Sequence, residues 1–163
     1  MNKLDLVQRL IQVEHVKIQS TKSFAEVKAT LEGSVPRLDA GVLAQLQQGE
    51  SERARSELVR LPALSIFSKR DHGHSFRSLA SCERRCSMKI GNPLTATQMT
   101  QHQLPAALYA PLRVLLYEDE AGRAVFEYDR PASLFGQFGD ERVTAVAREL
   151  DAKLESALIR AAS

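Results

Sequence analysis

The chain has 163 residues, the usual size of one domain and enough to bury a hydrophobic core without disulfide or metal staples. With 44% hydrophobic and 26% charged residues, its composition excludes disordered, collagen-like and coiled-coil proteins. The 22 basic and 20 acidic residues leave a net charge of +2, far from the basic excess of a typical nucleic-acid-binding protein. We therefore expect a single domain over residues 1–163, with no nucleic acid among its partners.

The chain lacks the patterns of a membrane span or an export signal. Its apolar runs fall well short of the roughly 20 residues that span a bilayer, and residues 1–12 alternate charged residues with Leu and Val. Cys82 and Cys86 lie four apart, a spacing typical of neither a redox pair nor a zinc site with a visible second half. The sequence predicts a cytoplasmic protein with two free thiols and no membrane contact.

The first predicted elements are a strand and a helix. Residues 13–19 alternate so that Val16 and Ile18 share one face, which is typical of a strand. Ser23 and Glu26 have the spacing of a capping box, and apolar residues then recur at helical intervals up to a Gly and a Pro that end the helix.

An inserted helical segment and a hairpin follow. Residues 38–61 predict a short helix capped by Asp39, a break at Gly49 and a second helix. Residues 64–69 and 87–90 are short apolar segments on either side of an Asp-His-Gly turn signature, so they are predicted to be the strands of a hairpin.

A Gly-Asn-Pro sequence predicts the next helix. Asn92 can cap it, Pro93 is favoured at its first position, and the helical pattern reaches about Gln103. Pro111 restricts the residue before it to extended backbone, so the chain is expected to re-enter a sheet at Leu112.

The C-terminal part predicts two strands and a long helix. Residues 112–118 and 123–129 alternate on either side of a short acidic turn and form the clearest hairpin in the sequence. Asp140 caps a last helix that carries one continuous apolar stripe. The order strand, helix, four strands, helix predicts an α+β fold of two layers, an antiparallel sheet with helices on one face.

Between this hairpin and the last helix, residues 131–140 hold Leu134, Phe135 and Phe138 without any period. Glycines follow the first phenylalanine and the second. We predict a hydrophobic loop that either buries its aromatic rings against the sheet or closes a pocket or a subunit interface.

Three residues could carry acid–base chemistry. His102, Tyr109 and Asp129 supply a base, a phenol and a carboxylate near helix and strand ends, where clefts form. The plainer interpretation makes Tyr109 a core or interface aromatic, pairs Asp129 with Arg130 and leaves His102 on the surface. The sequence has no nucleophile elbow, phosphate loop, dinucleotide fingerprint or HExxH motif, so catalytic residues stay unassigned.

Metal sites have weaker support. Met99 and His102 share a helix face and could ligate a soft metal or haem, but a Met on an apolar face is usually part of the core. His72 and His74 could join the two cysteines at a zinc ion, but the atypical spacing favours solvated turn residues. We expect no metal and no cofactor.

The densest basic stretch comprises Arg77, Arg84, Arg85 and Lys89. Such a stretch is usually a solvated strand edge that discourages edge pairing. It could also receive an anionic ligand.

Two stretches of this chain resemble a known protein family. The run IGNPLTATQMTQHQLPAALYAPLRVLLYEDEAGRAVFEYDRPASLFGQFGDERV, residues 90–143, resembles the bacterial domain-of-unknown-function 302 (DUF302) family, and RDHG at residues 70–73 is similar to an earlier signature of that family. The helical pair at residues 38–61 resembles an expansion seen in one subgroup. The resemblance implies a fold similar to that of the TATA-box-binding protein, often as a homodimer, and no assigned activity.

We expect a homodimeric domain that binds a small, partly apolar ligand or a partner subunit between the sheet and the loop at residues 131–140. The candidate ligand-binding residues are His102, Tyr109, Arg113, Asp129 and Phe135. One alternative is an enzyme that uses His102 and Asp129 as acid and base, and another is a purely structural interaction module. A concave pocket that gathers these side chains would favour the ligand or the enzyme.

Overall fold

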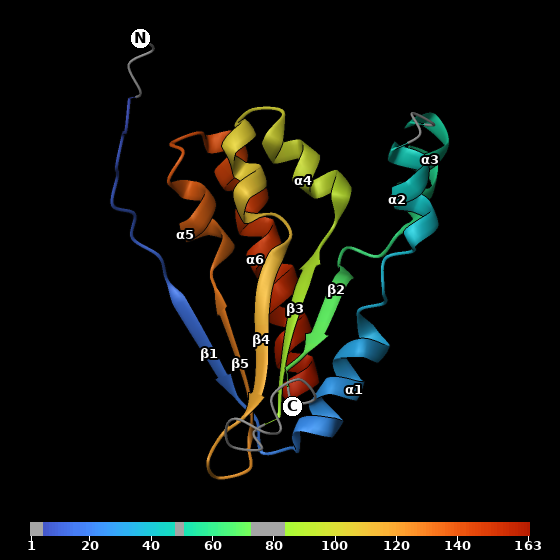
Figure 1. Cartoon of the computed structure of the whole chain (residues 1–163), viewed down its shortest axis with the longest axis vertical. Coiled ribbons are helices and arrows are strands. Elements are labelled where there is room, and N and C mark those ends of the chain that lie inside the picture. The colour runs from blue at the N-terminus through green and yellow to red at the C-terminus, as the bar shows by residue number, and fades with distance from the viewer. Residues whose placement is uncertain (1–4, 48–50, 73–83) are drawn as a thin grey trace.

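The computed structural model describes residues 5–47, 51–72 and 84–163 (Figure 1). In chain order its elements are β1 (His15–Gln19), α1 (Phe24–Ser34), α2 (Ala40–Gln47), α3 (Ser51–Arg60), β2 (Ser65–Asp71), β3 (Arg85–Gly91), α4 (Pro93–Thr100), the 3-10 helix η1 (Leu104–Tyr109), β4 (Leu112–Glu118), β5 (Ala124–Asp129), α5 (Pro131–Gly136) and α6 (Glu141–Ala162). The five strands form one sheet in the order β1-β5-β4-β3-β2. Every neighbouring pair is antiparallel, which confirms the predicted α+β fold.

Helices cover one face of the sheet, and the opposite face is open. Figure 1 is viewed onto the open face, with α6 running behind the strands. Alternate residues of the central strands are buried toward α6, as a half-buried sheet requires. They include Met88 and Ile90 on β3, Val114 and Leu116 on β4, and Phe126 and Tyr128 on β5. The apolar stripe of α6 is buried against them, as its sequence period predicts.

Two helix caps confirm predictions made from local sequence. The Ser23 hydroxyl accepts a hydrogen bond from the Glu26 amide (3.4 Å), and the Glu26 carboxylate accepts one from the Ser23 amide (3.0 Å). The Asn92 side chain accepts hydrogen bonds from the amides of Leu94 (2.8 Å) and Thr95 (3.3 Å), so α4 begins where the Gly-Asn-Pro sequence predicts. A side-chain oxygen satisfies amides that have no partner inside the helix.

Two segments differ from the prediction. The helix that begins at Pro93 ends at Thr100, three residues early, and the chain continues as η1. Residues 131–136 form a helix, α5, where the sequence predicts a loop. The Asp151 carboxylate on α6 accepts a hydrogen bond from the Ala132 amide (3.1 Å) and so supplies the missing cap of α5 from a distant part of the chain.

The hairpin predicted around the Asp-His-Gly turn is present, since β2 pairs with β3. Its turn, with His74, Arg77 and Cys82, lies outside the described residues. Within residues 38–61, α2 and α3 form the helical pair that Figure 1 shows beside β2. In the part of the chain that the structure describes, no helix combines the length and the apolar character needed to cross a membrane.

Candidate functional site

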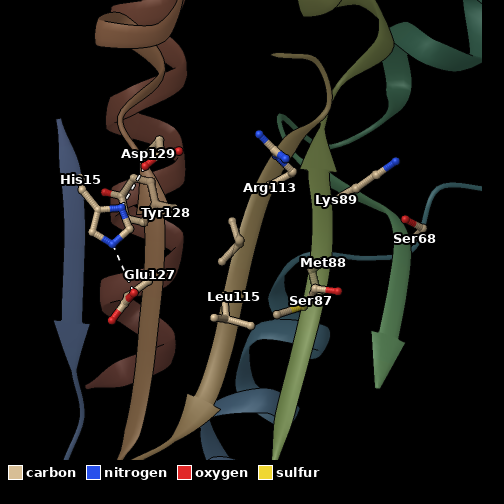
Figure 2. Close-up of a pocket in the computed structure, with 11 residues that line it drawn as sticks. His15, Ser68, Ser87, Met88, Lys89, Arg113, Leu115, Glu127, Tyr128 and Asp129 are labelled. Carbon is tan, nitrogen blue, oxygen red and sulfur yellow. Dashed lines mark hydrogen bonds and ion pairs between the residues drawn. The ribbon is translucent and has the colours of Figure 1, made fainter. Parts of the chain in front are cut away.

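A groove of about 290 Å³ crosses the open face of the sheet, and Figure 2 shows the side chains around it. It is lined by His15, Ser68, Ser87, Met88, Lys89, Arg113, Val114, Leu115, Glu127, Tyr128 and Asp129. All five strands contribute to this lining. Ser87 and Lys89 on β3 face the groove together because residues two apart along a strand share a face. The groove therefore depends on the pairing of the whole sheet.

The side of the groove formed by β2, β3 and β4 is basic. Lys89 and Arg113 lie directly opposite each other on β3 and β4, and Ser68 lies opposite Lys89 on β2. Both cationic side chains are exposed. Neither makes a side-chain hydrogen bond or an ion pair with any described residue. Two positive charges thus face solvent side by side, with a hydroxyl next to them.

The side formed by β1 and β5 is acidic, and His15 connects its two carboxylates. His15 Nδ1 lies 2.9 Å from Asp129 Oδ1, and His15 Nε2 lies 3.2 Å from Glu127 Oε2 (Figure 2). The hydrogen bond with Asp129, followed by that with Glu127, raises the pKa of His15 above its ordinary value. When the imidazole is protonated, both of its ring nitrogens donate to a carboxylate, and its one positive charge offsets part of the negative charge on this side of the groove.

Tyr117 holds the carboxylate of Glu127 in place. Its hydroxyl donates a 2.7 Å hydrogen bond to Glu127 Oε1. This bond, together with that from His15, lowers the pKa of Glu127. Lys17 Nζ lies 3.7 Å from the same oxygen. Glu127 is therefore held ionised and oriented by three side chains.

Half-buried Leu115 separates the two sides at the middle of the groove. Its register partners are Glu127 on β5 and Ser87 on β3. The groove thus presents a row of basic, apolar and acidic surface across the sheet. Of its charged groups, only Lys89 and Arg113 have their charges free of any described partner, so an incoming anion would meet them first.

The five candidate residues from the sequence fall into three places. Arg113 and Asp129 both line the groove. Tyr109 and Phe135 contact each other on the helical side, with ring centroids 6.2 Å apart in an edge-to-face arrangement. His102 is half-buried just beyond α4, and it does not line the groove. The structure therefore does not gather the five into one site.

His15 and Glu127 are groove residues that sequence reasoning missed. Each occupies a polar position on a strand whose alternating residues are apolar, and that pattern places them on the open face. It gives no reason to place them beside each other. Lys89, by contrast, belongs to the basic stretch that the sequence singles out as a possible anion site.

Met99, Cys86 and His72 are possible metal ligands that lie among the described residues. Met99 is buried in the core at 1% exposure, as expected of a Met on an apolar face. Cys86 is buried with a free thiol whose pKa is raised by burial, and His72 Nε2 hydrogen-bonds to Ser87 Oγ at 2.8 Å. No cluster of three or more His, Cys, Asp or Glu side chains suited to a metal occurs among the described residues.

Comparisons with known proteins identify the family. No curated protein matches this chain. The fold is similar to the crystal structure of an uncharacterized conserved DUF302 protein from Bacillus stearothermophilus, with a TM-score of 0.65 and 15% sequence identity over 90% of this chain and 97% of that one. At this identity the likeness shows the fold alone. The profile of the domain of unknown function DUF302 matches residues 51–161, and the chain therefore belongs to the DUF302 family.

Proposed function

We propose that this protein binds a small anionic ligand in the groove on the open face of the sheet. The observation that carries the proposal is the pairing of Lys89 with Arg113 across β3 and β4, with no acidic partner among the described residues. Like charges directly opposite each other in a sheet are destabilising. An anion between them would remove that repulsion.

The chemistry of the basic side suits a carboxylate or a phosphate. A guanidinium presents a planar fork that matches two oxygens of such a group, and an ammonium adds a second charge. Ser68, next to Lys89, adds a hydroxyl that can donate to a third oxygen. The groove volume of about 290 Å³ fits a small molecule.

The test is a titration of isotopically labelled protein with acetate and with inorganic phosphate, followed by NMR. Saturable shifts are expected on β2, β3 and β4, and Arg113→Gln and Lys89→Gln should each weaken the binding by roughly tenfold, as loss of a charge-assisted hydrogen bond predicts. Arg148→Gln is the matched control, because Arg148 is an exposed arginine on α6 that pairs with Glu141. Absence of saturable shifts with both anions, or equal loss in the control, would refute the proposal.

Catalysis by His102 and Asp129 has less support. Asp129 faces the groove and hydrogen-bonds to His15, whereas His102 follows α4 and makes its backbone hydrogen bond to Met99. An acid and a base must both reach the reacting atoms.

We further propose that the protein forms a homodimer through the segment before β1, the arm at residues 5–14. Three of its apolar side chains are almost fully exposed, Leu6 at 83%, Val7 at 82% and Leu10 at 100%. Contiguous exposed apolar side chains favour an interaction surface. A second copy of the chain is the partner that such an arm would always have available.

A TATA-box-binding-protein-like fold and a bacterial, cytoplasmic setting are also proposals. The order of strands and helices supports the first. The similar Bacillus protein and the free thiol of Cys86 support the second, because reducing compartments keep thiols unpaired.

A further inference from the structure

A second cavity, of about 140 Å³, lies at the end of the sheet where β3 runs into α4. Its lining is almost entirely apolar and comprises Phe67, Gly91, Asn92, Pro93, Thr95, Ala96, Met99, Ala110, Pro111, Leu112 and Leu150. A cavity of roughly 150 Å³ with apolar walls accepts benzene in another protein. The volume and the lining therefore suit a single aromatic ring or a branched alkyl group.

Two residues that line this cavity lie close in sequence to the anion-binding side chains. Gly91 is two positions beyond Lys89 on β3, and Pro111 is two positions before Arg113 at the start of β4. Positions two apart along a strand share a face and are roughly 7 Å apart. Part of the cavity lining thus lies one side-chain step along the sheet from the two cations.

Gly91 leaves the space that opens the cavity. A Cβ at this position would lie 3.4 Å from Pro111 Cβ and 3.7 Å from Phe67 Cε2, which are ordinary van der Waals contacts. Phe67 reaches this place because β2 has an irregularity between Ile66 and Ser68 that shifts the register by one residue. A methyl group on residue 91 would therefore fit beside Pro111 and Phe67 without strain and would take up space in the cavity lining.

We propose that the ligand of this protein is an amphipathic anion, a carboxylate or phosphate that carries one compact apolar group. The anionic head pairs with Lys89 and Arg113, and the apolar group enters the cavity between Phe67 and Pro111. This assignment rests on the proposed anion-binding function and adds the class of molecule that the anion belongs to. Apolar surface of the ligand that leaves water in the cavity supplies affinity that the head alone lacks.

The experiment compares hydrocinnamate with propionate, which has the same head and lacks the ring, and with hydrocinnamyl alcohol, which has the ring and lacks the charge. The wild type should bind hydrocinnamate at least about tenfold more tightly than either, since each reference compound loses one of the two contacts. Gly91→Ala should reduce hydrocinnamate binding to the level of propionate and leave propionate unchanged. Gly33→Ala is the control, because a Cβ on Gly33 meets no atom within 4 Å.

Ala96→Leu fills the same cavity from α4 and repeats the test independently of the strand backbone. If Arg113→Gln weakens both anions while Gly91→Ala and Ala96→Leu change nothing, the anion site stands and the apolar cavity is not part of it. If neither anion binds the wild type, the anion-binding function itself is wrong. Binding of the alcohol as tight as that of hydrocinnamate would also overturn the amphipathic assignment, since the charge would then contribute nothing.

Discussion

His15 bridges two carboxylates on the open face, and its raised pKa makes this contact depend on pH. The pKa is raised above 6.5, so the imidazolium persists to higher pH in the folded protein than in the unfolded chain. A raised pKa means that the contact contributes its full stability below the pKa of the unfolded state and loses it as pH rises through the folded value. His15 is 57% exposed, and water therefore weakens the contribution.

We expect Asp129→Asn to lower the pKa of His15 more than Glu127→Gln does, because the hydrogen bond with Asp129 is the larger cause of the shift. Both amides keep the size of the side chain and remove its charge. An NMR titration of the His15 ring protons measures the two values. A His15 pKa that stays at the wild-type value in both variants would show that the bridge does not form in solution.

Local sequence patterns predicted the helix caps but could not predict the contact of His15 with two carboxylates. Ser23 and Asn92 bond amides two or three residues away, so a short stretch of sequence contains both partners. His15 and Asp129 are 114 positions apart. They meet because the first strand pairs with the last one, which no periodicity indicates.

α5 shows how a distant contact decides a local structure. The segment begins with Pro131 at its first turn and ends at Gly136, and six residues are too few to show a helical period. The cap that stabilises it is the Asp151 carboxylate of α6, which the sequence does not place near Ala132. Of the two alternatives that the sequence leaves open for its aromatic rings, burial within the domain agrees with Phe135, which is 0% exposed.

Phe135→Ala should lower the free energy of unfolding by about 3–5 kcal/mol, the usual cost of removing a fully buried aromatic ring. Tyr109 loses its edge-to-face partner in the same change. Thermal and denaturant melts measure the loss, with Leu134→Ala, a half-buried neighbour on α5, as the control of smaller expected effect.

The difference in melting temperature between the wild type and Phe135→Ala should stay constant over a roughly hundredfold dilution of the protein. A contact within the core of one subunit does not depend on a partner. An offset that grows or shrinks with concentration would place Phe135 in a subunit contact instead.

Two side-chain hydrogen bonds connect the arm at residues 5–14 to α5 and to the residue that follows it. Arg9 donates to the Gln137 side chain at 3.0 Å, and the Glu14 amide donates to the Ser133 hydroxyl at 3.0 Å. Figure 1 shows the arm leading from the N-terminal side into the start of β1, on the side of the molecule where α5 lies. The apolar side chains of Leu6, Val7 and Leu10 are left in water, an arrangement that a second subunit would relieve.

We therefore expect the wild type to sediment as a dimer at micromolar concentration and Leu6→Ser/Leu10→Ser to sediment as a monomer. Val59→Ser is the control, since Val59 on α3 is also exposed, at 68%, but lies away from the arm. Analytical ultracentrifugation over a dilution series measures the state. A wild type that is monomeric throughout, or a double variant that stays dimeric, would contradict the dimer.

Element order and strand order differed in how well the sequence predicted them. Alternation, turn residues and caps mark each element from within, so the strands and most helices were predicted close to their observed bounds. Strand order depends on which strands pair when the chain folds, and local sequence patterns do not show this. Here β1 pairs with β5 instead of its nearest strand in sequence, β2. The groove is assembled from that pairing, which is why Arg113 and Asp129 could be named while their surroundings could not.

The position of β1 at one edge of the sheet also affects the newly made chain. Its partner β5 is synthesised last among the strands, and His15 and Asp129 are 114 residues apart. At roughly 5–20 residues per second, the ribosome needs on the order of ten seconds to cover that interval. During this time Val16 and Ile18 have no strand to pair with, and they are available to chaperones and to neighbouring nascent chains. Only after β5 leaves the exit tunnel can the first strand of the protein take its place, so the N-terminal strand joins the sheet no earlier than the C-terminal one.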